Sequence, residues 1–252
     1  MTKAGTIVIG GPTASGKSAL TLELAQATGG MIINADSMQL YRELRILTAR
    51  PSPADEARVP HRLYGVLSAD QPGSAGKWLQ LAEVALREAA ERRRPAIVVG
   101  GTGLYLSALL NGLAEIPPVP PAFRAQAHEV YDELGGPGLH AALAERDPAM
   151  AARLAPHDRQ RLIRAYEVVS ATGRSLAVWQ AMPPLRLALP EPVTGLALMP
   201  PRADVYARIE HRLDRMIAAG ALDELRGLQG LGLPPQLPLL KAVAVRELLA
   251  FL

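Results

Sequence analysis

Residues 6–18 read TIVIGGPTASGKS, and this stretch decides the fold. Its first part, Thr6–Gly10, is a short β-branched run that ends in glycine, which is typical of a buried strand. Its second part fits G-x-x-x-x-G-K-[ST], the nucleotide-binding P-loop that joins a strand to a helix. In such a loop the backbone N–H groups surround a phosphate, Lys17 supplies a mobile cation and the Ser18 hydroxyl can bind Mg²⁺. The sequence therefore predicts a phosphate site at the front of an α/β fold.

Strand and helix patterns alternate through the first part of the chain. Runs similar to the first strand occur at 31–34 and 96–99, and amphipathic helical patterns occupy 18–27 and 77–93. Alternation of this kind indicates a parallel sheet with helices on both faces. We therefore expect a P-loop NTPase-like parallel sheet flanked by helices.

A proline-rich segment, IPPVPP at 116–121, interrupts this alternation and reads as a linker, because proline fixes φ and prevents regular structure. Every pattern that follows is helical until a second proline-rich stretch at 183–192. The helical patterns lie at 121–134, 139–146, 149–154 and 157–172. Beyond them, 194–199 predicts a buried strand and 203–219 an amphipathic helix that Gly220 ends. We expect an α/β core at 1–115 and 191–252, with a helical insertion domain at 116–190.

Composition narrows the class of protein. The 252 residues are 49% apolar, which allows a substantial core, and the absence of cysteine rules out disulfides and thiolate zinc sites. The five histidines are scattered without the spacing of metal ligands. The formal net charge of +3 permits a polyanionic partner without requiring one. The first apolar run is too short for a signal peptide or a membrane span, so we expect a cytoplasmic protein without membrane contact.

The P-loop identifies phosphates but not a reaction. A kinase usually carries an acidic residue after a later strand to hold Mg²⁺, and here Gly100 and Gly101 follow the candidate strand. The available carboxylate is Asp36, which follows the second strand and should lie at the same sheet edge as the P-loop. Asp36 is either a base or metal ligand, or an aspartate that stabilises a turn. Its position in the sequence leaves both interpretations open.

Longer motifs resemble the tRNA dimethylallyltransferase (tRNA isopentenyltransferase) family, in the family's order and spacing and nearly from end to end. The motifs are GPTASGKS at 11–18, NADSMQLYRELRILTARPS at 34–52, VPHRL at 59–63, VGGTGLYLSALLNGL at 99–113, HDRQRLIRAYEVVSATGRSL at 157–176, RIEHRLDRMIAAG at 208–220 and LKAVAVREL at 240–248. The P-loop alone is weak evidence, whereas the DSMQ, GGTGLY and QRL-x-RA-x-EV elements are much more specific.

The resemblance implies a monomeric prenyltransferase that uses Mg²⁺. Members transfer a dimethylallyl group from dimethylallyl diphosphate to N6 of the adenine 3′ of the anticodon in tRNA, and a helical insertion grips the anticodon stem-loop. It implies that Asp36 is the general base, that Thr102 lies between the prenyl and RNA sites, and that Arg212 meets the diphosphate. The residues implied to bind the diphosphate are Gly11, Thr13, Ala14, Ser15, Gly16, Lys17 and Ser18, with Ser18 also a metal ligand. Those implied to contact tRNA are Asp36, Ser37, Met38, Gln39, Thr102, Arg124, Gln160, Arg161, Leu162, Ile163, Arg164, Lys241 and Arg246.

The chain departs from the family pattern in several places. Leu47 and Arg50 replace the glycine and lysine of D-I-G-T-A-K-P, and Val245 replaces the tyrosine of K-A-V-G-Y-R-E. Members usually continue past the position of Leu252 with a basic R-x-Y-A-K-R-Q-x-T-W element that contacts RNA and closes the site. Two alternatives therefore remain beside the prenyltransferase. One is a P-loop small-molecule kinase, and the other is a truncated chain that binds phosphate or RNA without turnover.

Overall fold

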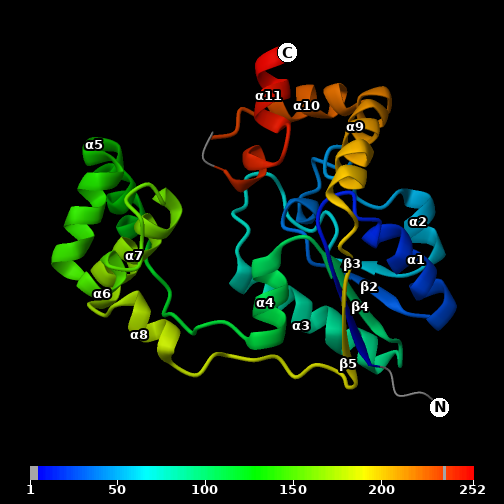
Figure 1. The fold of residues 1–252 in the computed structure, drawn as a ribbon, viewed down its shortest axis with the longest axis horizontal. Coiled ribbons are helices and arrows are strands. Elements are labelled where there is room, and N and C mark those ends of the chain that lie inside the picture. The colour runs from blue at the N-terminus through cyan, green and yellow to red at the C-terminus, as the bar shows by residue number, and fades with distance from the viewer. Residues whose placement is uncertain (1–4, 235–236) are drawn as a thin grey trace. The chain divides into compact units, whose positions relative to one another are not determined.

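The computed structural model describes residues 5–234 and 237–252. Its centre is a parallel sheet of five strands in the order β3-β2-β4-β1-β5 (Figure 1). The strands are β1 (Thr6–Gly10), β2 (Met31–Asn34), β3 (His61–Arg62), β4 (Ala96–Gly100) and β5 (Val193–Ala197). The predicted P-loop NTPase-like fold class is confirmed.

Helices on both sides of the sheet bury its central strands. On the side of α1 (Lys17–Thr28), Ile9, Ile32 and Ile97 pack together with Ala25 of that helix. On the other side lies α3 (Ala75–Glu91), whose apolar face is buried, with α4 (Gly103–Asn111) nearby (Figure 1). The short elements η1 (Met38–Leu40) and α2 (Pro53–Arg58) belong to the connection between β2 and β3. Strands and helices thus alternate as the sequence pattern predicts.

Strand β5 corrects one expectation. Its position matches the predicted strand, but all five of its residues are exposed, whereas the apolar run at 194–199 predicts burial. The reason is its place in the sheet, because β5 is an edge strand paired with β1 alone. Apolar composition indicates which side chains would be stabilised by burial, but the surrounding elements decide whether they are covered.

The insertion forms a second unit over residues 111–186, so its boundaries fall slightly before those expected from sequence. Its helices are α5 (Pro121–Arg146), α6 (Pro148–Ala151), α7 (Arg159–Thr172) and α8 (Leu176–Ala181). Within α5, Gly135 has a non-helical φ of 67° and ψ of −175°, and this kink divides the span into two helices, as the patterns at 121–134 and 139–146 predict. At the base of the unit, Leu113 and Leu185 exchange backbone hydrogen bonds of 3.1 and 3.0 Å.

The chain ends in helices of the first unit. These are α9 (Arg202–Ala218), α10 (Ala221–Gln229), η2 (Pro238–Lys241) and α11 (Val245–Phe251). The helix predicted at 203–219 is confirmed as α9, and Gly220 follows it with a φ of 99°, a conformation that favours glycine. In the part of the chain that the structure describes, no helix is long and apolar enough to cross a bilayer.

Candidate active site

The P-loop between β1 and α1 is shaped for an anion. Ala14 and Gly16 adopt left-handed backbone conformations, with φ of 60° and 93°, and the N–H of Ser15 donates to the Pro12 carbonyl at 3.3 Å. Gly16 caps α1 without a side-chain hydrogen bond, which leaves the first N–H groups of the helix available to a ligand. The Ser15 hydroxyl is buried and has no hydrogen-bond partner among the described residues. A phosphate oxygen would satisfy these donors.

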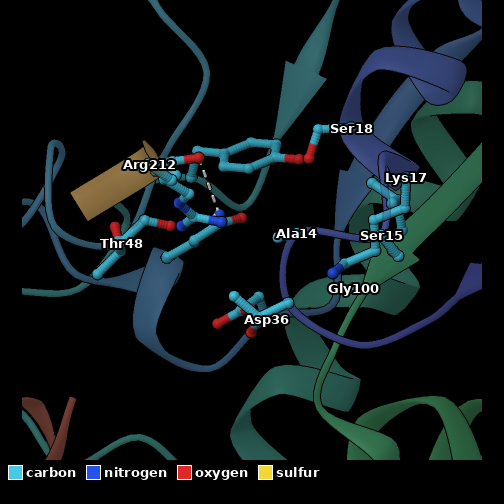
Figure 2. Close-up of a pocket in the computed structure, with 13 residues that line it drawn as sticks. Ala14, Ser15, Lys17, Ser18, Asp36, Thr48, Gly100 and Arg212 are labelled. Carbon is cyan, nitrogen blue, oxygen red and sulfur yellow. Dashed lines mark hydrogen bonds between the residues drawn. The ribbon is translucent and has the colours of Figure 1, made fainter. Parts of the chain in front are cut away.

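A cavity of about 70 Å³ opens beside this loop and joins three distant parts of the sequence (Figure 2). The P-loop contributes Thr13, Ala14, Ser15, Lys17 and Ser18 to its lining. Asp36 enters from the segment after β2, and Arg212 enters from α9. An adjoining groove of about 390 Å³ shares Ser18 and Arg212 with this cavity and adds Gly16 and Arg215. The structure thus brings together Asp36, Arg212 and most of the predicted diphosphate-binding residues.

Gly11 lies outside the lining of both hollows and has a packing role. A Cβ atom at Gly11 would lie 2.7 Å from the Leu198 carbonyl oxygen and 2.9 Å from the Ser15 hydroxyl. Any larger residue would therefore push the loop away from the chain that leaves β5. Gly11 acts by allowing this close approach of two backbones.

The cavity holds more positive than negative charge. Lys17 Nζ donates to the Pro12 carbonyl at 3.0 Å, and burial lowers the pKa of Lys17 from 10.5, with attraction to Asp36 opposing and repulsion from Arg212 adding to the shift. Burial likewise lowers the pKa of Arg212, while Asp36 raises it and Arg215 lowers it further. Two partly buried cations therefore face one carboxylate. A diphosphate placed here would compensate the cost of burying those cations.

Asp36 uses its two carboxylate oxygens differently. The backbone N–H of Met38 donates to Oδ1 of Asp36 at 2.9 Å, so this oxygen stabilises the turn after β2. The N–H of Asp36 itself donates to Asn34 Oδ1 at 2.8 Å, which holds the residue in place. The other oxygen, Oδ2, lies beside Gly101, and the Asp36 residue lines the cavity. Asp36 can therefore stabilise the turn through one oxygen and still act as a base or metal ligand through the other.

Thr102 supports the segment that carries Asp36 rather than lining the cavity. Its hydroxyl accepts the N–H of Ser37 at 2.9 Å and donates to the Ser37 hydroxyl at 3.3 Å. Because Thr102 lies between β4 and α4, this contact ties the two loops at the carboxyl edge of the sheet. Through these two bonds Thr102 is connected directly to the 36–38 turn.

The far wall of the cavity includes residues that the sequence analysis did not single out. Thr48, Ala49 and Tyr64 line it, and Gln39 Nε2 donates to the carbonyls of Thr48 and Ala49 at 2.8 and 3.1 Å. Burial, together with Asp36, raises the pKa of Tyr64, which keeps its phenol protonated. Thr48 and Ala49 lie inside the 34–52 motif, whereas Tyr64 directly follows the 59–63 motif. The motifs therefore indicated the segments that form this wall, but they did not indicate which of their side chains face the cavity.

The insertion presents arginines held by one buried carboxylate. Glu167 is 1% exposed and accepts hydrogen bonds from Arg124 Nε at 2.9 Å and Arg164 Nη1 at 2.6 Å. Arg161, whose side chain is 75% exposed, pairs with Asp158 at 3.4 Å, and Gln160 is also exposed. In the other unit, Lys241 and Arg246 are exposed on η2 and α11.

Leu162 and Ile163 require a correction within the set of residues predicted to contact tRNA. Their side chains are 0% and 7% exposed and belong to the core of the insertion. They stabilise α7, which carries the neighbouring arginines, and their buried side chains do not present a surface to RNA. The helical period places the 160, 161 and 164 positions outward and the 162 and 163 positions inward.

Comparison with known proteins identifies the family. The family model described as IPP transferase matches residues 39–252, and the one described as isopentenyl transferase matches residues 5–70. A tRNA dimethylallyltransferase of Rhodopseudomonas palustris (strain BisB18) is 54% identical over 248 residues, covering 98% of this chain and 78% of its own. One of Rhodospirillum rubrum is 55% identical over 242 residues, covering 96% and 74%.

A solved structure agrees with these sequences. The full-length tRNA isopentenylpyrophosphate transferase of Bacillus halodurans is 30% identical, with a TM-score of 0.63 over 99% of this chain and 77% of its own. The similarity covers nearly the whole of this chain, including the P-loop, the Asp36 turn and α9, which line the cavity. The chain belongs to the tRNA dimethylallyltransferase (tRNA isopentenyltransferase) family.

Proposed function

We propose that the chain transfers a dimethylallyl group from dimethylallyl diphosphate to N6 of the adenine 3′ of the anticodon in tRNA. Family membership supplies the reaction class. The observation that carries the proposal for this chain is the single cavity where P-loop donors, two cations and one oxygen of Asp36 meet. That arrangement suits a phosphate leaving group next to a base.

The reaction requires one bond to form as another breaks. The N6 nitrogen attacks the first carbon of the dimethylallyl group, and the bond from that carbon to oxygen breaks, so diphosphate departs with the electron pair. The N6 lone pair is delocalised into the adenine ring, which makes the amine a weak nucleophile. Oδ2 of Asp36 accepts the N6 proton, and a positioned base of this kind contributes about 10²–10⁴-fold. The hydrogen bond from the Met38 N–H to Oδ1 leaves Oδ2 free for this role.

The main requirement for catalysis is to stabilise the negative charge that develops on the departing diphosphate, and the chain's own residues can do this. Lys17, Arg212 and the N–H groups at the start of α1 stabilise the developing negative charge. Mg²⁺ is usually held by one or two side chains together with phosphate oxygens and water. Within the described residues no three acidic or histidine side chains cluster as a metal site, so the Ser18 hydroxyl and the substrate's phosphates would hold the ion. Bound there, Mg²⁺ would neutralise the leaving group.

We assign the anticodon stem-loop to the helical insertion. Arg124, Arg161 and Arg164 are exposed enough to reach RNA phosphates while Glu167 orients two of them. Lys241 and Arg246 add positive charge on the other unit. We propose that Ser37, Met38 and Gln39 contact the target base, and Gln39 lines the cavity. An enzyme that modifies a base must take it out of the stack. We further propose that one copy of the chain, as a monomer, contains all of these groups.

One experiment tests the function. The purified chain is given unmodified tRNA, radiolabelled dimethylallyl diphosphate and Mg²⁺, with ATP and small metabolites in a parallel assay, and Lys17→Ala serves as the control. We expect label in the tRNA with wild type, little with the variant, and no hydrolysis of ATP. Binding of both substrates without transfer would indicate a non-catalytic chain, and ATP-dependent phosphorylation of a metabolite would indicate a kinase.

A further inference from the structure

The loop at 44–50 forms a wall of the cavity, and its Leu44 and Leu47 side chains are buried. Thr48 and Ala49 line the cavity, and short backbone bonds close the loop, from Ala49 N–H to the Ile46 carbonyl and from Arg50 N–H to the Arg45 carbonyl, both at 2.9 Å. Gln39 holds the loop from the cavity side through the carbonyls of Thr48 and Ala49. The opposite side of the loop presents backbone N–H groups, which need acceptors.

Glu224 of α10 supplies those acceptors. Its carboxylate receives the N–H of Arg45 at 2.5 Å, that of Ile46 at 2.9 and 3.1 Å, and that of Leu47 at 3.0 Å. Three successive N–H groups that converge on one anion form a nest, and each bond is strengthened by the charge. The Arg45 side chain is engaged elsewhere, with Glu56 at 2.7 Å. Backbone N–H groups therefore provide the direct contacts to Glu224 in the described structure.

The same contact reaches the helix that carries Arg212. Gly220 joins α9 to α10, and a Cβ atom on it would lie 3.9 Å from the Ile46 side chain. The groove beside the cavity is lined by Ile46 and Ala49 on one side and by Arg212 and Met216 on the other. Glu224 therefore connects the loop to the pair of helices α9 and α10.

We propose that Glu224 is a positioning residue that holds the 45–49 wall of the diphosphate cavity, and with it the distance between that wall and Arg212. The proposal rests on the proposed function only for the identity of the ligand as a diphosphate. Glu224 does not line the cavity, so it acts through the loop. Loosening the loop should weaken substrate binding far more than it slows the chemistry of the bound complex, since Asp36 is held by other contacts.

The test compares wild type, Glu224→Gln and the matched control Asp223→Asn. Asp223 is the neighbour on α10, with an 80% exposed side chain paired to Arg226. For Glu224→Gln we expect faster hydrogen exchange at the amides of 45–47 and affinity for Mg²⁺-pyrophosphate lower by about tenfold, because a neutral oxygen replaces the charged acceptor. The KM for dimethylallyl diphosphate should rise by a similar factor with kcat nearly unchanged. Asp223→Asn should match wild type throughout.

Several outcomes would overturn the proposal. One is Glu224→Gln with wild-type pyrophosphate affinity and KM, whether or not amide protection at 45–47 is lost. Another outcome is measured on the wild-type protein. Pyrophosphate should slow amide hydrogen exchange at residues 45–49, and exchange that saturating pyrophosphate leaves unchanged would contradict the proposed role of Glu224. Wild type that binds pyrophosphate but transfers no dimethylallyl group would overturn the proposed function alone, since the exchange and affinity measurements still decide the role of Glu224.

Discussion

Asp36 and Lys17 face each other across Gly101. A Cβ atom on Gly101 would lie 3.7 Å from Oδ2 of Asp36 and 3.7 Å from Nζ of Lys17. The preceding glycine has a different neighbourhood, because a Cβ atom on Gly100 would lie 2.1 Å from the Ala35 carbonyl oxygen. Gly100 therefore allows two chain segments to approach, whereas Gly101 leaves free the space beside the Asp36 carboxylate and the Lys17 ammonium.

This contrast predicts opposite results for two similar substitutions. Gly100→Ala should lower the free energy of unfolding by about 1–3 kcal/mol, because the new methyl group displaces backbone. Gly101→Ala meets ordinary contact distances and should fold normally, while its transfer rate falls by roughly tenfold or more as the reacting groups are pushed off line. Melting temperature and single-turnover rate, measured on each protein, check both statements. A Gly101→Ala enzyme with wild-type turnover would show that the space above Gly101 is not used.

The substitution Asp36→Asn distinguishes the structural role of one carboxylate oxygen from the proposed chemical role of the other. An asparagine Oδ1 can still accept the Met38 N–H, so the turn and the melting temperature should be preserved. The amide cannot take the N6 proton, so the single-turnover rate should fall by about 10²–10⁴-fold with substrate affinities little changed. A well-folded Asp36→Asn protein with nearly normal chemistry would remove Asp36 from the mechanism and leave it a turn residue.

The lowered pKa of Lys17 predicts how diphosphate binding depends on pH. Burial favours the neutral amine, so Lys17 loses its proton below its usual value of 10.5. Affinity for pyrophosphate should therefore be highest while the ammonium is protonated and should decrease as pH rises through the lowered pKa. Calorimetric titrations in alkaline buffers of increasing pH test this, with Lys17→Arg as the comparison because its charge persists. Parallel pH profiles for the two proteins would argue against Lys17 as the titrating group.

The exposed arginines of the insertion should govern tRNA affinity and its salt dependence. Arg161→Ala should weaken tRNA binding and reduce the slope of log K against log salt by about one, without altering pyrophosphate affinity. Arg164→Ala should do the same and should also destabilise the insertion, because it removes a partner of the buried Glu167 carboxylate. Arg87→Ala on α3 is the matched control, an exposed arginine with one exposed partner. Salt slopes equal to that of wild type for Arg161→Ala and Arg164→Ala would remove these side chains from the RNA contact.

Sequence was most informative where structure depends on neighbours along the chain. The P-loop, the strands at 6–10, 31–34 and 96–100 and the helix ended by Gly220 follow from local composition and backbone preferences, and they were predicted nearly to the residue. An error arose where a wider environment decides. The apolar pattern at 194–199 could not reveal an edge strand that no other element covers, whereas the glycines at 135–136 correctly marked the kink between two helices.

By itself, then, the sequence determined the phosphate-binding loop, the order of strands and helices, and a family resemblance. Each of these depends on short patterns of neighbouring residues. Only the tertiary structure decided which side chains share the cavity and which are buried in the insertion, as Leu162 and Ile163 are. It also decided that Oδ1 and Oδ2 of Asp36 have different surroundings and that Glu224 meets Arg45, 179 positions away. No local pattern encodes such contacts, because they exist only once packing has brought the sheet edge and the C-terminal helices together.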